Sequence, residues 1–200
     1  MTQTDMPSGS TRALFIDRDG VINVDHGYVH RIDQFDFIPG IFELARYVTG
    51  ELRWPIIVAT NQSGIGRGYF DEHAYAALTE WMCERFRQEG APLTRVYHCP
   101  YHPQHGVGAY RAEHPWRKPQ PGMFVQAASD FGISLTDSVL IGDRMSDIEA
   151  AVAAGIRLRI LLASPESGQP AQAPSHIVAA NLEAVLRLIR DFATSLDGSR

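Results

Sequence analysis

The chain has 200 residues, of which 44% are hydrophobic and 20% are charged, and its formal net charge at pH 7 is −5. This length and composition predict one globular domain with a sizeable core. The acidic balance argues against the basic surface of a nucleic-acid-binding protein. No segment approaches the roughly 20 consecutive apolar residues of a membrane span, and the N-terminal residues lack the apolar core of a signal peptide.

Apolar runs and their spacing predict strands that alternate with helices along the chain. In chain order, the pattern predicts a strand over 13–16, an irregular segment over 21–38, a helix over 41–49, a strand over 55–59, a helix over 71–89, a strand over 95–98, a loop over 99–117, a helix over 122–131, a strand over 138–141, a helix over 146–154, and then strands over 158–162 and 176–178 and a helix over 181–194. This alternation implies an α/β fold in which a doubly wound parallel sheet lies between flanking helices.

The helix over 71–89 has a clear start, a buried face and an end. Asp71 is a suitable N-cap, Gly90 follows the last turn, and one apolar stripe is formed by Tyr75, Leu78, Met82 and Phe86. We expect a single domain over 12–194, with polar tails at 1–11 and 195–200. Because the chain has only two cysteines, Cys83 and Cys99, we also expect free thiols and a cytoplasmic location, and we expect the protein to be a monomer.

Two carboxylates follow the first predicted strand, in the run ALFIDRDGV over 13–21. Asp17 and Asp19 are two positions apart, so on extended backbone their side chains face the same small volume. Two like charges so close require a cation between them or a proton on one of them. A magnesium site with one carboxylate as nucleophile and the other as acid/base meets this requirement. The alternative is that Asp19 only caps the turn at Gly20.

Three more polar motifs end or precede predicted elements. Thr60 to Gly64 follow the second strand, Arg117 to Gly122 precede a helix, and Gly142 to Asp147 follow the strand over 138–141. Together with Asp-x-Asp-Gly, and in this order, these motifs resemble the haloacid dehalogenase (HAD) superfamily of phosphohydrolases. The resemblance extends from about Leu14 to Ala154 and implies a HAD-like fold. The intervals between the motifs are too short for a large cap domain, so loops should cover the site.

The resemblance implies a role for each motif residue. Asp17 would attack phosphorus and form an aspartyl-phosphate, and Asp19 would act as general acid and base. Asp17 and Asp143 would hold Mg²⁺ through their side chains and Asp19 through its backbone carbonyl. Thr60 and Asn61 would donate to the phosphoryl oxygens, with Lys118 adding positive charge. Asp147 is either a partner of Lys118 or of a metal-bound water, or simply a first-turn carboxylate favoured by the helix dipole.

More specific motifs resemble the D-glycero-D-manno-heptose 1,7-bisphosphate 7-phosphatase family, with histidinol-phosphate phosphatases as its sister group. They are Asp-His-Gly-Tyr-Val over 25–29, the run over 60–68, Cys-Pro-Tyr-His-Pro over 99–103 and the run over 117–123. The resemblance implies substrate contacts from Asp25, His26, Gly27, Tyr28, Thr60, Asn61, Gln62, Ser63, Arg117, Lys118 and Arg144. Arg117 is the candidate for a distal phosphate, because its guanidinium can bind bidentately. The glycine-rich run over 63–67 lacks the ending of a Walker motif and is interpreted as pocket wall.

One departure concerns a structural zinc site that members of this family commonly carry. Of the family's four ligand positions only Cys99 matches plainly, and His114 is a substitution that is still able to coordinate; Tyr101 and Trp116 occupy the other two. We expect no stoichiometric zinc and a loop held by packing, although nearby histidines leave a rearranged site open.

The resemblance implies a hydrolase that removes the 7-phosphate of a heptose bisphosphate, in carbohydrate metabolism that supplies heptose for cell-surface polysaccharide. Histidinol phosphate is the alternative substrate of the same reaction class. A non-catalytic module that binds a phosphorylated ligand is disfavoured by the presence of both Asp17 and Asp19, and a nucleic-acid end phosphatase by the acidic balance of the chain.

Overall fold

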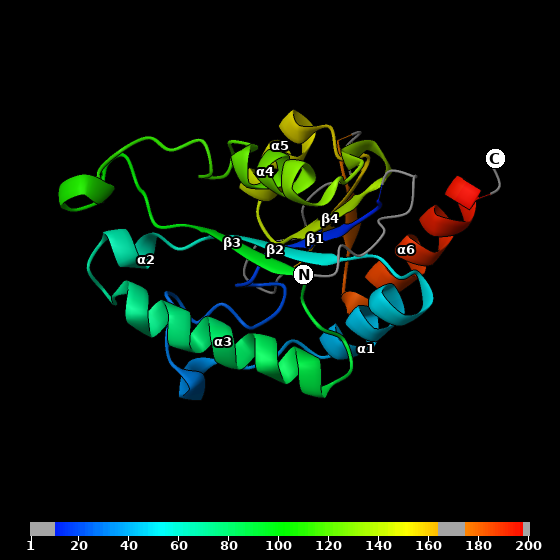
Figure 1. Cartoon of the computed structure of the whole chain (residues 1–200), viewed down its shortest axis with the longest axis horizontal. Coiled ribbons are helices and arrows are strands. Elements are labelled where there is room, and N and C mark those ends of the chain that lie inside the picture. Colours follow the sequence, from blue (N-terminus) through cyan, green and yellow to red (C-terminus); the bar gives the residue numbers. More distant parts are fainter. Residues whose placement is uncertain (1–10, 164–174, 198–200) are drawn as a thin grey trace, which may run out of the picture.

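The computed structural model describes residues 11–163 and 175–197, which form a parallel six-stranded sheet between two layers of helices (Figure 1). The strand order is β3-β2-β1-β4-β5-β6 and every pairing is parallel. The strands are β1 (Leu14–Ile16), β2 (Ile56–Asn61), β3 (Arg95–Cys99), β4 (Val139–Gly142), β5 (Leu158–Leu162) and β6 (Ile177–Ala179). This order confirms the predicted doubly wound α/β fold.

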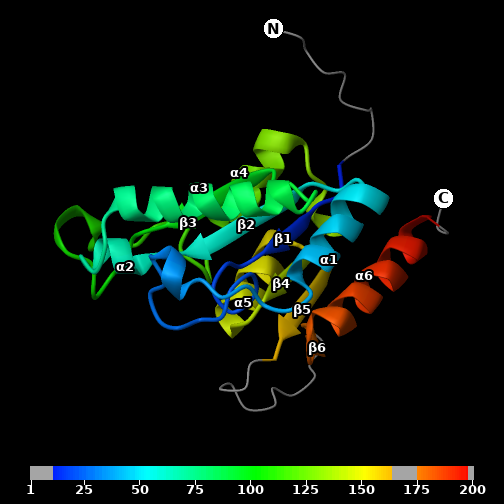
Figure 2. The same cartoon turned by 90° about the horizontal axis from the view of Figure 1, so that it is seen from below.

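The helices cover both faces of the sheet. Figures 1 and 2 show α1, α3 and α6 on one face and α4 and α5 on the other. The helices are α1 (Ile41–Arg46), α2 (Ser63–Gly66), α3 (Glu72–Gln88), α4 (Gly122–Phe131), α5 (Met145–Ala154) and α6 (Leu182–Asp197), with short helical turns at Ile32–Gln34, Tyr47–Glu51, Gly108–Tyr110 and Leu135–Asp137. None of these helices is long and apolar enough to cross a membrane, as far as the described residues go.

Successive side chains of the central strands contribute to two separate hydrophobic cores, one on each face of the sheet. Leu14 and Ile16 of β1 belong to the cluster under α1, α3 and α6, whereas Phe15 points to the cluster under α4 and α5. Phe15 meets Phe124 of α4 edge to face, with 5.2 Å between the ring centroids. Successive side chains of a strand face opposite ways, so an apolar run without alternation is what a strand covered on both faces requires.

The long helix α3 follows the prediction closely. The Asp71 side chain accepts a hydrogen bond from the backbone N–H of Ala74 at 2.8 Å, which satisfies a free donor of the first turn. The buried residues of α3 are the four of the predicted stripe: Tyr75, Leu78, Met82 and Phe86.

The predicted tails need two corrections. Helix α6 continues to Asp197, so residues 195–197 are not tail; Leu196 is only 8% exposed and extends the buried stripe that includes Ile189 and Ala193. Thr11 is also anchored, because its backbone N–H donates to the carbonyl of Gly132 and its carbonyl accepts from the N–H of Ser134. Residues 1–10 and 198–200 of the predicted tails lie outside the described residues.

The strand order reverses beside β1, which places the functional motifs. The chain runs from β1 to β2 on one side, and β4 pairs with β1 on the other. Loops that leave β1 and β4 in opposite directions open a crevice at the carboxyl ends of these strands. Asp17 and Asp143 follow these two strands directly. Loops rather than a large cap domain surround this end of the sheet (Figure 2).

Candidate active site

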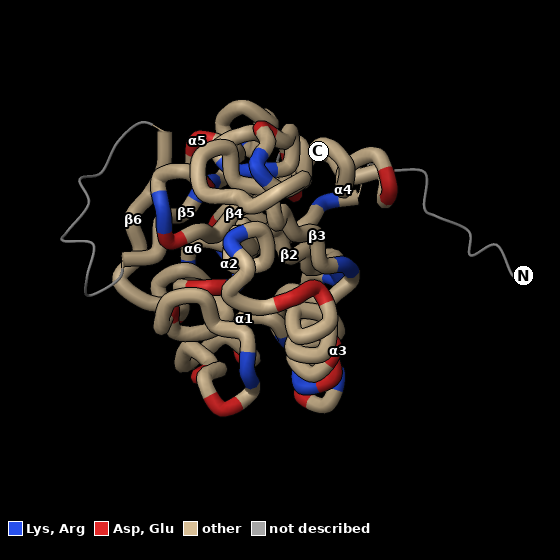
Figure 3. Tube along the Cα trace, turned by 90° about the vertical axis from the view of Figure 1, so that its left-hand side faces the viewer, with Lys and Arg blue, Asp and Glu red and all other residues tan. Residues whose placement is uncertain are grey.

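A cavity of about 580 Å³ opens at the carboxyl ends of the strands. Figure 3 looks onto this end of the molecule, where acidic and basic positions both lie on the surrounding loops. The cavity is lined by Asp17, Asp19, Asp25, Gly27, Tyr28, Thr60, Asn61, Gln62, Ser63, Gly64, Arg67, His102, Arg117, Lys118, Pro119, Arg144, Ser146 and Asp147. The structure therefore brings together the predicted motifs, which are far apart in sequence.

Lys118 lies at the floor of the cavity between two carboxylates. Its side chain is almost fully buried, and its Nζ lies 3.0 Å from Oδ2 of Asp17 and 2.6 Å from Oδ1 of Asp147. Nζ also donates to the carbonyl of Ala59 at 2.8 Å. Burial opposes the charge on Lys118, but the two carboxylates outweigh it and raise the pKa of the ammonium. Lys118 is therefore held as a fixed positive charge beside Asp17.

Asp147 pairs with Lys118, which is one of the roles that the sequence left open for it. It is 1% exposed, and its second oxygen accepts the backbone N–H of Arg144 at 3.0 Å, at the start of α5. Gly142 is necessary for this approach, because a Cβ at that position would lie 2.3 Å from Cβ of Asp147. Both carboxylate oxygens of Asp147 are thus used within the protein.

Three carboxylates nevertheless form one cluster, because oxygen atoms of Asp17, Asp143 and Asp147 all lie within 4.8 Å of one another. Oδ1 of Asp143 is buried and has no hydrogen-bond partner. Gly20, with φ of 82°, allows Asp143 to approach, since a Cβ there would lie 2.2 Å from Oδ2. An unpartnered buried carboxylate oxygen beside a second carboxylate fits a hard divalent cation such as Mg²⁺. Asp143, whose Oδ1 has no protein partner, and the neighbouring Asp17 would hold the ion.

Two carboxylates of the cluster, Asp17 and Asp143, have pKa values above the ordinary range of an aspartate. Burial, together with the charges of Asp17 and Asp147, raises the pKa of Asp143 to about 8. Burial also raises the pKa of Asp17, although Lys118 opposes this shift. A cation bound between these carboxylates would replace the proton and remove the repulsion.

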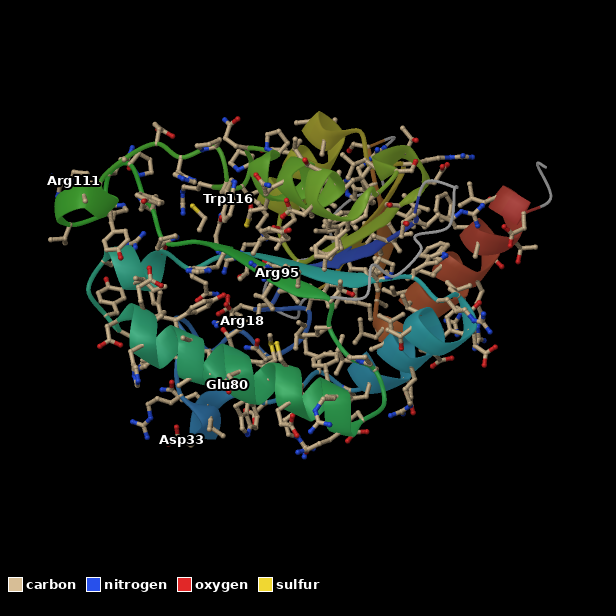
Figure 4. All side chains as sticks on the ribbon, viewed as in Figure 1. Arg18, Asp33, Glu80, Arg95, Arg111 and Trp116 are labelled. Carbon is tan, nitrogen blue, oxygen red and sulfur yellow. The ribbon has the colours of Figure 1, made fainter. Side chains whose placement is uncertain are left out.

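Asp19 is held in one orientation by three side chains. Its two oxygens accept from Nη2 of Arg18 at 3.0 and 2.8 Å, from Nδ2 of Asn23 at 3.0 Å and from Nε2 of Gln62 at 2.9 Å. Arg18 is 1% exposed and lies between the sheet and α3 (Figure 4). The sequence predicted Gln62 as a substrate contact, whereas its amide is here committed to Asp19 and to Oγ1 of Thr60.

Asn61, a predicted phosphoryl donor, also contacts the backbone of Lys118. Its Nδ2 donates to the carbonyl of Lys118 at 3.0 Å, and its Oδ1 accepts the backbone N–H of Lys118 at 3.1 Å. This paired contact uses the carbonyl oxygen and one N–H of the amide, and the second N–H of Nδ2 is left for another acceptor. Asn61 therefore lines the cavity and also fixes the backbone that carries Lys118.

The segment over 25–28 folds across the mouth of the cavity. Oδ2 of Asp25 accepts Nη2 of Arg144 at 2.6 Å, which ties this segment to the loop after β4. Oδ1 of Asp25 accepts the N–H of Gly27, and this tight turn directs His26 away from the cavity. His26 therefore does not line the cavity, contrary to the prediction, and its Nε2 lies 2.8 Å from Asp36. Tyr28, 43% exposed, remains on the rim.

Basic side chains also line the cavity. Arg117 is half-buried, and its Nη1 donates to the carbonyl of Tyr101 at 3.1 Å. Arg67 and His102 also line the cavity, but sequence reasoning did not select them. Arg67 is the last residue of the glycine-rich run over 63–67, which the sequence predicts as pocket wall. A cationic residue in a predicted pocket wall is the signal that could have identified it as a candidate for phosphate binding. His102 was considered only as a possible zinc ligand.

Aromatic side chains pack in the 99–117 loop at positions that the sequence analysis compared with the ligand positions of a zinc site. The rings of Tyr101 and His114 stack at 4.4 Å with only 2° between their planes. Trp116, labelled in Figure 4, meets Tyr97 edge to face at 5.7 Å. Cys99 is buried, and burial raises the pKa of its thiol.

Known proteins resemble this chain over most of its length. Residues 115–185 match the family model of HAD-hydrolase-like proteins. The chain is 48% identical to D-glycero-alpha-D-manno-heptose-1,7-bisphosphate 7-phosphatase of Burkholderia mallei, over 84% of this chain and 88% of the relative. It is 43% identical to D-glycero-beta-D-manno-heptose-1,7-bisphosphate 7-phosphatase of Vibrio cholerae, over 90% of this chain and 92% of the relative. The solved D,D-heptose 1,7-bisphosphate phosphatase of B. bronchiseptica, complexed with magnesium and phosphate, has a TM-score of 0.77 and 27% identity, covering 90% of this chain and 99% of that one.

The raised pKa of Asp143 leads to a prediction for the metal-free protein. Because this pKa is about 8 in the folded chain and ordinarily 3.8, the folded chain binds more protons than the unfolded chain between these values. The contribution of Asp143 to stability is therefore lost as the pH rises through about 8. Melting temperatures in EDTA should fall between pH 6 and 9, and less steeply for Asp143→Asn. Added Mg²⁺ should raise the melting temperature of the wild type more at high pH. Identical slopes for the two proteins would contradict this account.

The 99–117 loop leads to a second prediction. A closed zinc site needs four tetrahedral ligands, and Tyr101 and Trp116 occupy two of the family's positions. Protein purified without a histidine tag and then dialysed should contain far less than one zinc per chain by elemental analysis. Cys99→Ser should then leave the metal content unchanged. About one zinc per chain, lost in Cys99→Ser together with a lower melting temperature, would show that the histidines have rebuilt the site.

Proposed function

The chain belongs to the D-glycero-D-manno-heptose 1,7-bisphosphate 7-phosphatase family, and we propose that it hydrolyses the 7-phosphate of this sugar bisphosphate with Mg²⁺ as cofactor. The observation that carries the proposal is the pairing of Asp17 with buried Lys118 in a cavity that Arg117, Arg67 and Arg144 also line. A bisphosphate needs positive charge for two phosphate groups, and the lining of this cavity includes several cationic side chains.

Asp17 is the proposed nucleophile. A carboxylate oxygen of Asp17 attacks phosphorus, the bond from phosphorus to the sugar oxygen breaks, and an aspartyl-phosphate forms. When bound, Mg²⁺ supplies positive charge that allows an anionic carboxylate to approach an anionic phosphate. The Lys118 ammonium, 3.0 Å from Asp17, is in place to stabilise charge on the transferring phosphoryl group.

Asp19 is the proposed general acid and base. It gives a proton to the departing sugar oxygen and later takes one from the water that attacks the aspartyl-phosphate. The hydrogen bonds from Arg18, Asn23 and Gln62 support this role, because they fix the carboxylate at the cavity wall. Thr60 and Ser63, which line the same part of the cavity, are proposed to contact the phosphoryl oxygens.

The several cationic side chains of the cavity and the names of the relatives favour a bisphosphate over histidinol phosphate, which carries one phosphate group. The proposal places the reaction in the cytoplasm, in keeping with the free thiols of Cys83 and Cys99. It also takes one chain as the working unit, because residues of a single chain line the cavity.

The first test of the function is a substrate comparison. The wild type with Mg²⁺ should release phosphate from heptose 1,7-bisphosphate much faster than from histidinol phosphate, and both anomers should be assayed. Asp17→Asn should abolish turnover because it removes the nucleophile, and Asp19→Asn should slow it roughly 10²–10⁴-fold. EDTA should silence the wild type. Substantial activity of a folded Asp17→Asn protein in EDTA would refute the mechanism, and preferred turnover of histidinol phosphate would refute the substrate.

The second test concerns Arg117. If Arg117 binds the distal phosphate, Arg117→Ala should lower kcat/KM for the heptose bisphosphate by roughly 10–100-fold, which corresponds to about 1.5–3 kcal/mol for a charge-assisted contact. Hydrolysis of p-nitrophenyl phosphate, which has no second phosphate, should change little. Equal losses on the two substrates in steady-state assays would assign Arg117 to the reacting phosphate or to the loop.

A further inference from the structure

Two basic side chains beside Arg117 have no part in the mechanism above. Arg67 comes directly after α2, and His102 comes from the 99–117 loop. Both line the same cavity as Arg117, although all three lie on separate segments of the chain. The carboxylates that line the cavity are Asp17, Asp19, Asp25 and Asp147, and each is already bonded to a partner.

Arg67 has an unused donor and a constrained position. Its Nε is buried and has no hydrogen-bond partner. Its guanidinium lies over the ring of Tyr28, 5.6 Å from the centroid, and Tyr28 is on the rim of the cavity. Within the described residues, Arg67 forms no ion pair with a carboxylate. A guanidinium that is stacked on a ring and lacks a carboxylate partner is preorganised for an incoming anion.

His102 presents a defined hydrogen-bond donor. Its Nδ1 accepts the backbone N–H groups of Gln104 at 3.2 Å and His105 at 3.1 Å. In the neutral ring the proton must then be on Nε2, which leaves Nε2–H as a donor. Burial lowers the pKa of His102, and the nearby charges of Arg117 and Arg67 lower it further. His102 is therefore a neutral donor near neutral pH.

The charges of Arg67 and Arg117 also affect each other and His102. Burial lowers the pKa of Arg117, and Arg67 acts in the same direction. Two guanidinium groups that repel each other at one end of a cavity are stabilised when an anion with several oxygens binds between them. A phosphate dianion has three terminal oxygens and matches such a set of donors.

We propose that Arg67 and His102 complete, with Arg117, an anion subsite for the phosphate that is not hydrolysed. The inference rests on the proposed function and deepens it: Arg67 and His102 are residues that determine specificity for a bisphosphate. The subsite is built from the residue that follows α2, from the 99–117 loop and from the residue before Lys118, so this loop contributes directly to substrate choice.

The test uses substitutions that separate binding from loop structure. Arg67→Met should raise KM for the heptose bisphosphate roughly 10–100-fold with little change in kcat, because a charge-assisted contact is lost. His102→Asn keeps an acceptor near the Nδ1 position but removes the Nε2–H donor, and should raise KM roughly 2–10-fold. His102→Gln, which returns an amide donor near the Nε2 position, should recover most of this loss.

Three controls make the result specific. None of the variants should change p-nitrophenyl phosphate hydrolysis, and Arg87→Met, on the exposed surface of α3, should change neither substrate. Melting temperatures identify any variant whose fold is damaged. If Arg67→Met and His102→Asn fold normally and leave KM for the bisphosphate unchanged, the subsite is refuted. Equal losses on both substrates would also refute it, because that pattern indicates a role at the reacting phosphate.

A second measurement separates this subsite from the identity of the sugar. Fructose 1,6-bisphosphate and fructose 6-phosphate should be compared as inhibitors of p-nitrophenyl phosphate hydrolysis. The wild type should bind the bisphosphate more tightly, and Arg67→Met and His102→Asn should reduce that preference. This outcome supports the subsite even if heptose bisphosphate proves not to be the substrate. The absence of any bisphosphate preference in the wild type would overturn the subsite.

Discussion

The buried ammonium of Lys118 is the charge around which the site is built. Removing an ammonium from water is costly unless carboxylates and further hydrogen bonds surround it, and here Asp17, Asp147 and the carbonyl of Ala59 do so. These groups come from the ends of β1 and β2 and from α5, and Lys118 lies just before α4. One ion cluster therefore fixes the relative positions of four elements, and loss of either carboxylate would leave buried charge uncompensated.

Several local features follow from this constraint. Asn61, at the end of β2, holds the backbone of Lys118 in place through two hydrogen bonds. Gly142 has to lack a side chain because Asp147 occupies that space. The remaining acid, Asp143, has a buried oxygen with no protein partner. Lys118 thus forms ion pairs with Asp17 and Asp147. Asp143, which Lys118 does not bind, has the oxygen that is left for a cation beside Asp17.

Apolar runs and turn residues were sufficient to predict the sheet, the helices and the meeting of the motifs, because parallel strands bring their carboxyl ends to one edge. The partners within the site were not predictable in the same way. Asn61 bonds to the backbone of Lys118 and Gln62 bonds to Asp19, and both contacts join segments that are remote in sequence. For Asp147 the sequence offered pairing with Lys118 only as one alternative, and the structure contains that pair. His26 was assigned by its place in a motif, whereas the turn at Asp25 directs it outward. Periodicity locates an element but does not orient a polar side chain.

The 99–117 loop connects packing with recognition. Arg117 donates to the carbonyl of Tyr101, whose ring stacks on His114, so the position of this guanidinium depends on aromatic packing in the loop. The same loop brings His102 to the cavity. The stacking of Tyr101 on His114 and the edge-to-face contact of Trp116 with Tyr97 give this loop a fixed shape. Because Arg117 and His102 both line the cavity, a change in the packing of this loop would also change the charge and the hydrogen-bond donors that the cavity offers to a ligand.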